Sequence, residues 1–256
     1  MHWKIVESVR KNEGVNFEQL AEFLGLFRGN QQNVGACFTL NQDLFFEIPK
    51  NGLNEDLIWQ SFVPIGYEYK RDTKGDIDLN SKIVLPNDKF THPTINNETR
   101  FCYMKLHGSL NWRSSEDRSR IVMGDANYKI EQIQAEPLLD FYINQFQGAI
   151  NSGKVQLLVI GYGFRDRHIN KFLLKAVNEH ELNIHIISTT NEEKFKEILK
   201  STSKEIFWDE DNRDEQSGTK LCGAIKGYYP YRMNAIFPKN ESKTNTAVTL
   251  TKIFSS

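Results

Sequence analysis

The chain has 256 residues, enough for one large domain or two small ones. Apolar residues make up 39% and aromatic residues 12%, a composition that suits a packed core and excludes a wholly disordered chain. The net charge of −1 gives no overall basic field, so the composition carries no strong signal for nucleic-acid binding.

The N-terminal half predicts helices followed by a buried strand. Residues 3–27 favour two helices, because apolar side chains recur there at helical spacing. The short apolar segment 36–40 predicts a strand, and a helix is expected to start near Asn41 or Asp43. From 51 to 135 we expect an irregular, β-rich insertion with hairpins. It includes a strand over 101–107 that ends in a turn at Gly108, and a hairpin with a polar tip near 113–124.

The C-terminal half alternates between helices and strands. Residues 136–151 predict a helix with Pro137 in its first turn, and the helix is followed by an apolar strand that ends in Gly161-Tyr162-Gly163. Helices over 166–180 and 191–201 flank a further strand at 182–189. The acidic segment 203–220 is expected to be a surface loop. We expect one α/β domain over 1–238, a Rossmann-like parallel sheet flanked by helices, and a loose tail over 239–256.

Three strand ends in this pattern are polar, and ligands of open α/β sheets bind beyond such ends. The first strand is followed by Asn41 and the second by His107. Asn41 offers both a donor and an acceptor, His107 is a natural base near neutral pH, and a Gly-x-Gly turn lets a backbone approach a ligand. Structural explanations stay open: Asn41 or Asp43 can cap a helix, His107 can be a structural histidine, and Gly161 can serve tight packing.

The order of three motifs resembles a known family. FTLNQD, then KLHGS, then VIGYGFRD is similar to the sirtuin-like fold, in particular to the bacterial sirtuin-like domains of anti-phage defence. The resemblance implies NAD as substrate and NAD or ADP-ribose as ligand. It implies Asn41 and His107 as catalytic residues, with His107 as the base. The cofactor-binding residues that it implies are Thr39, Asp43, Gly108, Ser109, Gly161, Tyr162, Gly163 and Asp166, with Asn170 near the same pocket.

Two departures from the family pattern shape the expected activity. The cysteine module that binds zinc in deacetylating sirtuins is absent, so we expect no metal and disfavour protein deacylation. The G-A-G-x-S phosphate loop is also absent, and with it the backbone N–H groups that would hold a pyrophosphate. We therefore expect an NAD hydrolase with weakened NAD binding. A non-catalytic nucleotide-binding or scaffold module is the alternative.

Partners and location follow from the same features. Loss of the strand before that loop would leave an open edge beside residues 36–40, which a second copy of the chain or a defence-system protein could cover. Only three, widely spaced cysteines occur, the first residues lack the apolar run of a signal peptide, and no apolar run approaches the ~20 residues of a membrane span. The sequence thus predicts a cytoplasmic protein without membrane contact.

Overall fold

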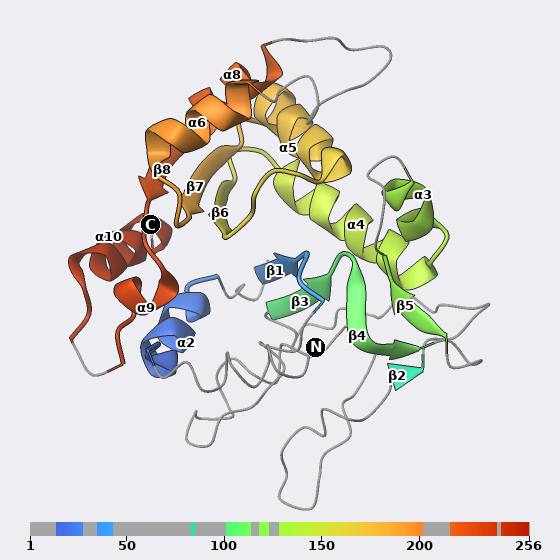
Figure 1. Cartoon of the computed structure of the whole chain (residues 1–256), viewed down its shortest axis with the longest axis horizontal. Helices are drawn as coiled ribbons and strands as arrows, with labels where there is room; N and C mark the ends of the chain where they lie inside the picture. The colour runs from blue at the N-terminus through green and yellow to red at the C-terminus, as the bar shows by residue number, and fades with distance from the viewer. Residues whose placement is uncertain are drawn as a thin grey trace, which may run out of the picture. The chain divides into compact units, whose positions relative to one another are not determined.

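The computed structural model describes residues 14–27, 35–42, 83–84, 101–113, 118–122, 128–201, 216–239 and 242–255 (Figure 1). These residues form two compact units. One draws on 1–123, 131–143 and 237–256, and the other on 124–130 and 144–236. Helices α3 (Lys129–Gln134) and α4 (Pro137–Ile150) contribute residues to both. No helix of the described part is long and apolar enough to cross a membrane.

The first unit contains two small sheets. Strands β1 (Gly35–Thr39) and β3 (Phe101–Lys105) pair in parallel. Strand β4 (Gly108–Arg113) pairs in parallel with β2 (Ile83–Val84) and in antiparallel fashion with β5 (Ser119–Ile121). The β4–β5 pair confirms the predicted hairpin. Within the described residues, β1 has one strand neighbour, β3.

Two helices at opposite ends of the chain pack together in this unit. Helix α2 (Phe17–Gly25) begins after Asn16, whose side chain accepts hydrogen bonds from the backbone N–H groups of Glu18 and Gln19. In helix α10 (Asn245–Phe254), the centroid of the Phe254 ring lies 6.4 Å from that of Phe23 in α2 and 4.9 Å from that of Phe27 just after α2. The loose tail predicted over 239–256 is therefore wrong, because burial of apolar side chains against α2 stabilises a helix there.

The second unit is built on a three-stranded parallel sheet. Its strand order is β6 (Gln156–Ile160), β7 (Asn183–Ile187) and β8 (Ile225–Tyr229). Helix α8 (Ser217–Ala224) contacts both α5 (Arg167–His180) and α6 (Glu192–Ser201), and Figure 1 shows the three helices grouped along the same side of the strands. The short helix α9 (Met233–Ile236) follows β8. The parallel pairings confirm the α/β prediction.

Two predicted boundaries are wrong. The turn expected at Gly108 lies at Leu106 and His107, and Gly108 is the first residue of β4. The surface loop expected over 203–220 ends earlier, because α8 begins at Ser217. A side chain at Gly218 would overlap the backbone carbonyl of Leu199 on α6, so this glycine permits the close approach of the two helices. The helix expected to start near Asp43, and most of the expected insertion, lie outside the described residues.

Candidate functional site

The first group of predicted site residues lies where β1 and β3 end. Thr39 is the register partner of Lys105, and the Leu106 N–H donates to the Thr39 carbonyl over 2.9 Å. The Asn41 N–H donates to the Thr39 hydroxyl over 3.0 Å, and the Asn41 side chain is exposed. Farther along, the Leu110 N–H donates to the Gln42 carbonyl over 3.0 Å. The structure thus brings the segments around Asn41 and His107 together through backbone hydrogen bonds. Asp43 lies outside the described residues.

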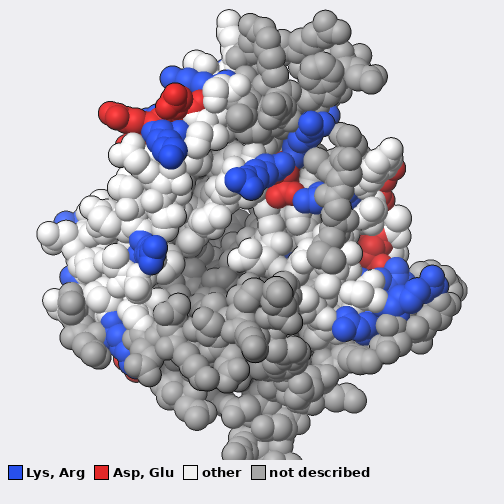
Figure 2. Space-filling model, in the orientation of Figure 1, with Lys and Arg blue, Asp and Glu red and all other residues white. Residues whose placement is uncertain are grey.

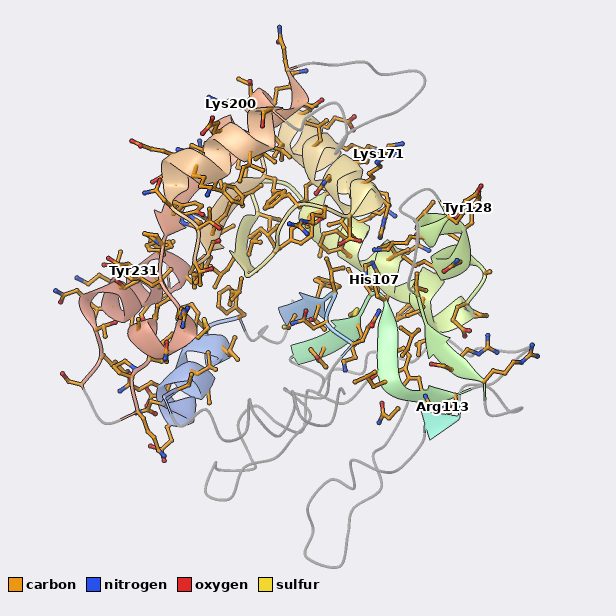
Figure 3. The ribbon with its side chains drawn as sticks, in the orientation of Figure 1. His107, Arg113, Tyr128, Lys171, Lys200 and Tyr231 are labelled. Atoms are coloured by element: carbon orange, nitrogen blue, oxygen red, sulfur yellow. The ribbon has the colours of Figure 1, made fainter. Side chains whose placement is uncertain are left out.

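His107 occupies the two-residue turn between β3 and β4 (Figure 3). It is 4% exposed, and its carbonyl accepts a hydrogen bond from the Val122 N–H over 3.0 Å. Gly108, next to it, has a φ of +79°, in the left-handed region that favours glycine. A Cβ atom here would overlap the carbonyl oxygen of Arg120 on β5. The glycine after His107 therefore has a packing reason that is independent of any ligand.

A buried lysine stands beside this turn. Lys105, the last residue of β3, is fully buried, and its Nζ donates to the hydroxyl of buried Ser109 over 2.9 Å. Burying an ammonium is costly unless polar groups surround it, so this contact ties β3 to β4 across the turn that carries His107. The sequence analysis assigned Ser109 to the site but gave no role to Lys105, the first residue of the KLHGS motif. The i, i+4 spacing of a lysine and a serine around a turn was the available signal.

The third predicted group forms the turn from β6 to α5, in the second unit. Gly161 has a φ of +66° and Phe164 one of +54°. The Tyr162 hydroxyl donates to the side-chain oxygen of Asn170 over 2.8 Å, and the Asn170 amide donates to the Phe164 carbonyl over 2.9 Å. Asn170 is fully buried, so it fixes the turn from within. Burial raises the pKa of the Tyr162 hydroxyl, which stays protonated.

Asp166, the residue before α5, forms an ion pair with Lys129. Its carboxylate lies 2.5 Å from the Lys129 ammonium, and it is not among the residues that line the cavity described below. Nearby His168 is 5% exposed, and burial lowers its pKa to about 4. Asp166 acts in the opposite direction, and Lys129 lowers the pKa further. His168 is therefore neutral near pH 7.

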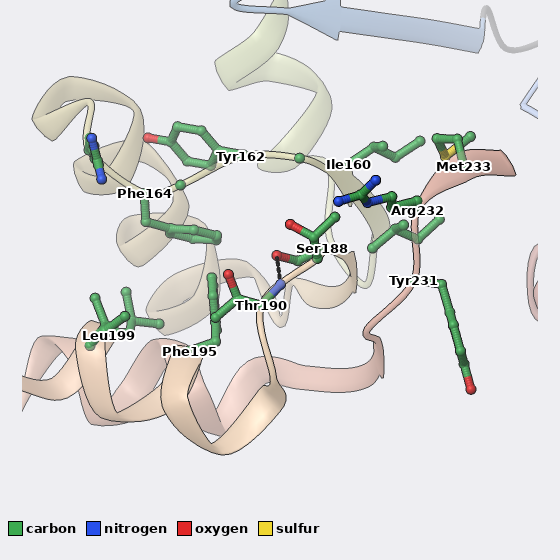
Figure 4. A pocket seen from close by; sticks show the side chains of 16 residues that line it. Ile160, Tyr162, Phe164, Ser188, Thr190, Phe195, Leu199, Tyr231, Arg232 and Met233 are labelled. Carbon is green, nitrogen blue, oxygen red and sulfur yellow. Dashed lines mark hydrogen bonds between the residues drawn. The ribbon is translucent and has the colours of Figure 1, made fainter. Parts of the chain in front are cut away.

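A cavity of about 490 Å³ opens at the carboxyl ends of β6, β7 and β8 (Figure 4). Its size falls within the range of small-molecule sites. Gly161, Tyr162 and Gly163 line it, and their role in cofactor binding stays a prediction. The rest of the lining consists of aromatic rings, hydroxyls, two arginines and aliphatic side chains: Phe164, Phe195 and Tyr231; Ser188, Thr189 and Thr190; Arg165 and Arg232; and Ile160, Ile187, Ile198, Leu199 and Met233.

The sequence analysis missed the part of this lining that follows β7 and β8. Ser188 to Thr190 come directly after the apolar strand β7, and Arg232 comes three residues after β8 ends. Ligands of open α/β sheets bind beyond the carboxyl ends of the strands, and this rule could have identified the segments after β7 and β8 as well. On the face drawn in Figure 2, the described Lys and Arg lie in several separate groups rather than as one basic surface.

A parallel sheet flanked by helices, with a cavity beyond its carboxyl ends, defines an α/β fold of the Rossmann-like class. The model of the SIR2-like domain matches residues 36–213, and the chain belongs to this family. The resemblance seen in the sequence motifs is thereby confirmed at the level of the sirtuin-like domain. A comparison with curated proteins gives no match.

Proposed function

We propose that the chain binds NAD and hydrolyses the bond between nicotinamide and ribose, an NAD-depleting activity of the anti-phage defence type. The observation that carries the proposal is the cavity at the carboxyl ends of β6, β7 and β8 in a chain of the SIR2-like family. Its lining suits the adenosine half of NAD. Aromatic rings offer stacking surfaces, hydroxyls can pair with a ribose or a base, and arginines can pair with phosphate.

The proposed hydrolysis needs a water molecule, a leaving group and a base. Water would add to the ribose C1′ as nicotinamide leaves with the bonding electron pair, and a base would accept the proton of the water. The resemblance gives His107 the role of this base and Asn41 the role of positioning the ribose or the water. Support for His107 comes from the backbone hydrogen bonds on both sides of its turn, which hold the residue in one place. The products would be nicotinamide, ADP-ribose and a proton.

A second candidate is a nucleotide-binding module without turnover. One sequence feature favours it, namely the absence of the G-A-G-x-S motif, whose backbone N–H groups would hold the pyrophosphate. Loss of such hydrogen bonds, each worth ~1.5–3 kcal/mol, would weaken NAD binding by orders of magnitude. We therefore expect slow hydrolysis by the isolated chain. Protein deacylation is disfavoured because the zinc-binding cysteines are absent.

Release of nicotinamide from NAD by the purified chain tests the proposal. We expect release above the rate without protein, and a fall of ~10²–10⁴-fold in His107→Ala, the usual worth of a general base. Asn41→Ala should also lower the rate strongly. His180→Ala, at the end of α5, is the matched control and should keep full activity. Activity that survives His107→Ala removes the catalytic assignment. ADP-ribose binding without nicotinamide release supports the second candidate.

A further inference from the structure

The cavity of the second unit carries positive charge that no carboxylate on its wall offsets. Among the sixteen described residues that line it are two arginines, Arg165 and Arg232, and no aspartate or glutamate. Both arginine side chains are exposed, and neither forms a hydrogen bond or an ion pair with another described residue. An anionic group of a ligand would therefore meet guanidinium groups without competition from the cavity wall.

The backbone at Arg232 is fixed while its side chain remains available. The Tyr231 N–H donates to the Tyr229 carbonyl over 2.8 Å, and the Ala235 N–H donates to the Arg232 carbonyl over 2.9 Å. These bonds hold the segment between β8 and α9. Figure 4 shows the Arg232 side chain extending from this segment toward Ser188 at the end of β7. The guanidinium is thus placed over the end of the middle strand of the sheet.

The end of β7 itself is rich in hydroxyls. Ser188, Thr189 and Thr190 follow the strand, and the Thr190 N–H donates to the Ser188 hydroxyl over 3.2 Å. In dinucleotide-binding α/β folds, a carboxylate near a strand end binds the 2′-hydroxyl of the adenosine ribose, whereas an arginine accommodates a 2′-phosphate. A carboxylate at this position would repel a 2′-phosphate. The described lining has hydroxyls and an arginine here and no carboxylate.

We propose that this cavity prefers a nucleotide with a phosphate on the 2′-oxygen of its adenosine ribose, so that the 2′-phosphorylated dinucleotide NADP binds more tightly than NAD. The inference rests on the proposed function, which places the adenosine half in this cavity. Arg232 pairs with the 2′-phosphate, and the hydroxyls after β7 donate to its remaining oxygens. Arg165, from the turn between β6 and α5, adds a second positive charge to the lining.

Calorimetric titration of the full chain with adenine nucleotides tests this preference. We expect 2′,5′-ADP to bind at least about tenfold more tightly than 5′-AMP, as one charge-assisted contact allows. The isomer 5′-ADP has the same number of phosphates as 2′,5′-ADP but none on the 2′-oxygen, and it should bind less tightly than 2′,5′-ADP. In Arg232→Gln the ratio between the 2′,5′-ADP and 5′-AMP affinities should fall to about one. Arg118→Gln, at an exposed arginine that is not among the lining residues, is the matched control and should keep the preference.

The outcomes separate this inference from the function on which it rests. If 5′-AMP and NAD bind but 2′,5′-ADP binds no more tightly, the preference is refuted and the proposed function stands. A preference that persists in Arg232→Gln refutes the role of this arginine. If no adenine nucleotide binds to the full chain, both the inference and the placement of the adenosine half in this cavity are overturned.

Discussion

Replacing Gly108 with alanine tests whether the glycine after His107 is required by packing. Two costs arise together. The residue has a φ of +79°, which L side chains rarely adopt, and the new Cβ would overlap the Arg120 carbonyl oxygen and lie 3.3 Å from the Ile121 Cα. Both neighbours belong to the backbone of β5, so no rotamer change relieves the overlap. The hairpin must shift instead.

The two costs set the expected loss of stability. A left-handed backbone costs a non-glycine residue ~1–2 kcal/mol, and forcing atoms into a packed region costs ~1–3 kcal/mol. Together they predict a fall of ~2–5 kcal/mol in the free energy of unfolding. For a chain of this size, 1 kcal/mol corresponds to ~2–4 °C in Tm, so Tm should fall by ~4–20 °C.

Thermal unfolding followed by circular dichroism measures this loss. Gly148→Ala, within helix α4, is the matched control, since no atom lies within 4 Å of a Cβ built there. Alanine has the higher helix propensity, so this control should leave Tm unchanged or raise it by a few degrees. A Gly108→Ala protein with the wild-type Tm would refute the packing explanation and leave a ligand contact as the reason for the glycine.

Three further predictions concern a buried histidine, helix α10 and a buried thiol. The pKa of His168 is lowered to about 4 chiefly by burial, so the unfolded chain binds the proton first and stability should fall as the pH drops from ~6.5 to ~4. In urea unfolding, His168→Gln should lose ~1–2 kcal/mol less than the wild type between pH 7.5 and pH 5; equal losses would contradict the assignment. Leu250→Ala should lower the free energy of unfolding by ~2–5 kcal/mol because the side chain is fully buried, whereas Val248→Ala, at an exposed position of the same helix, should change it little. Equal effects of the two substitutions would contradict a packed helix α10. Burial raises the pKa of the Cys102 thiol to about 11, so an aromatic disulfide reagent at pH 8 should react with at most two of the three thiols until denaturant is added; three thiols titrated in the native protein would contradict this burial.

Strong periodicity made the second unit predictable. The apolar runs that form β6 and β7, and the 3.6-residue spacing in α5 and α6, each specify one kind of element without reference to the rest of the chain. Pro137 marked the first residue of α4 for an equally local reason. These elements were placed correctly because local preference and tertiary packing agree there.

Where local preference and tertiary packing disagree, the sequence alone did not predict the structure. Helix α10 contains four threonines and valines in ten residues, which lowers its helix propensity, and its polar composition favoured a tail. Burial of Leu250 and the ring contact with Phe27, more than 200 residues away in the chain, outweigh that preference. The start of β4 at Gly108 likewise depends on the backbone of Arg120 on β5, which lies close to Gly108 and far from it in the sequence pattern.

The sequence predicted which individual strand ends are polar, but it did not predict which residues from different strands line one cavity. Gly161 to Gly163 stand out because glycines follow an apolar strand. Arg232 does not stand out, since its place in the cavity depends on β8 pairing beside β7. Lys105 was missed because its burial next to Ser109 follows from the reversal of the chain at His107.

The rings beside the cavity also give this protein a built-in optical probe. Tyr162, Phe164, Phe195 and Tyr228 form a chain of neighbouring rings, with centroids 4.7, 5.5 and 5.3 Å apart. The full chain has four tryptophans, none of them in residues 128–201 or 216–239, so the signal of these rings is read as the difference between spectra with and without ligand. A purine stacked on one ring would couple to the whole chain, and its arrival could be followed without a label by the change in that spectrum.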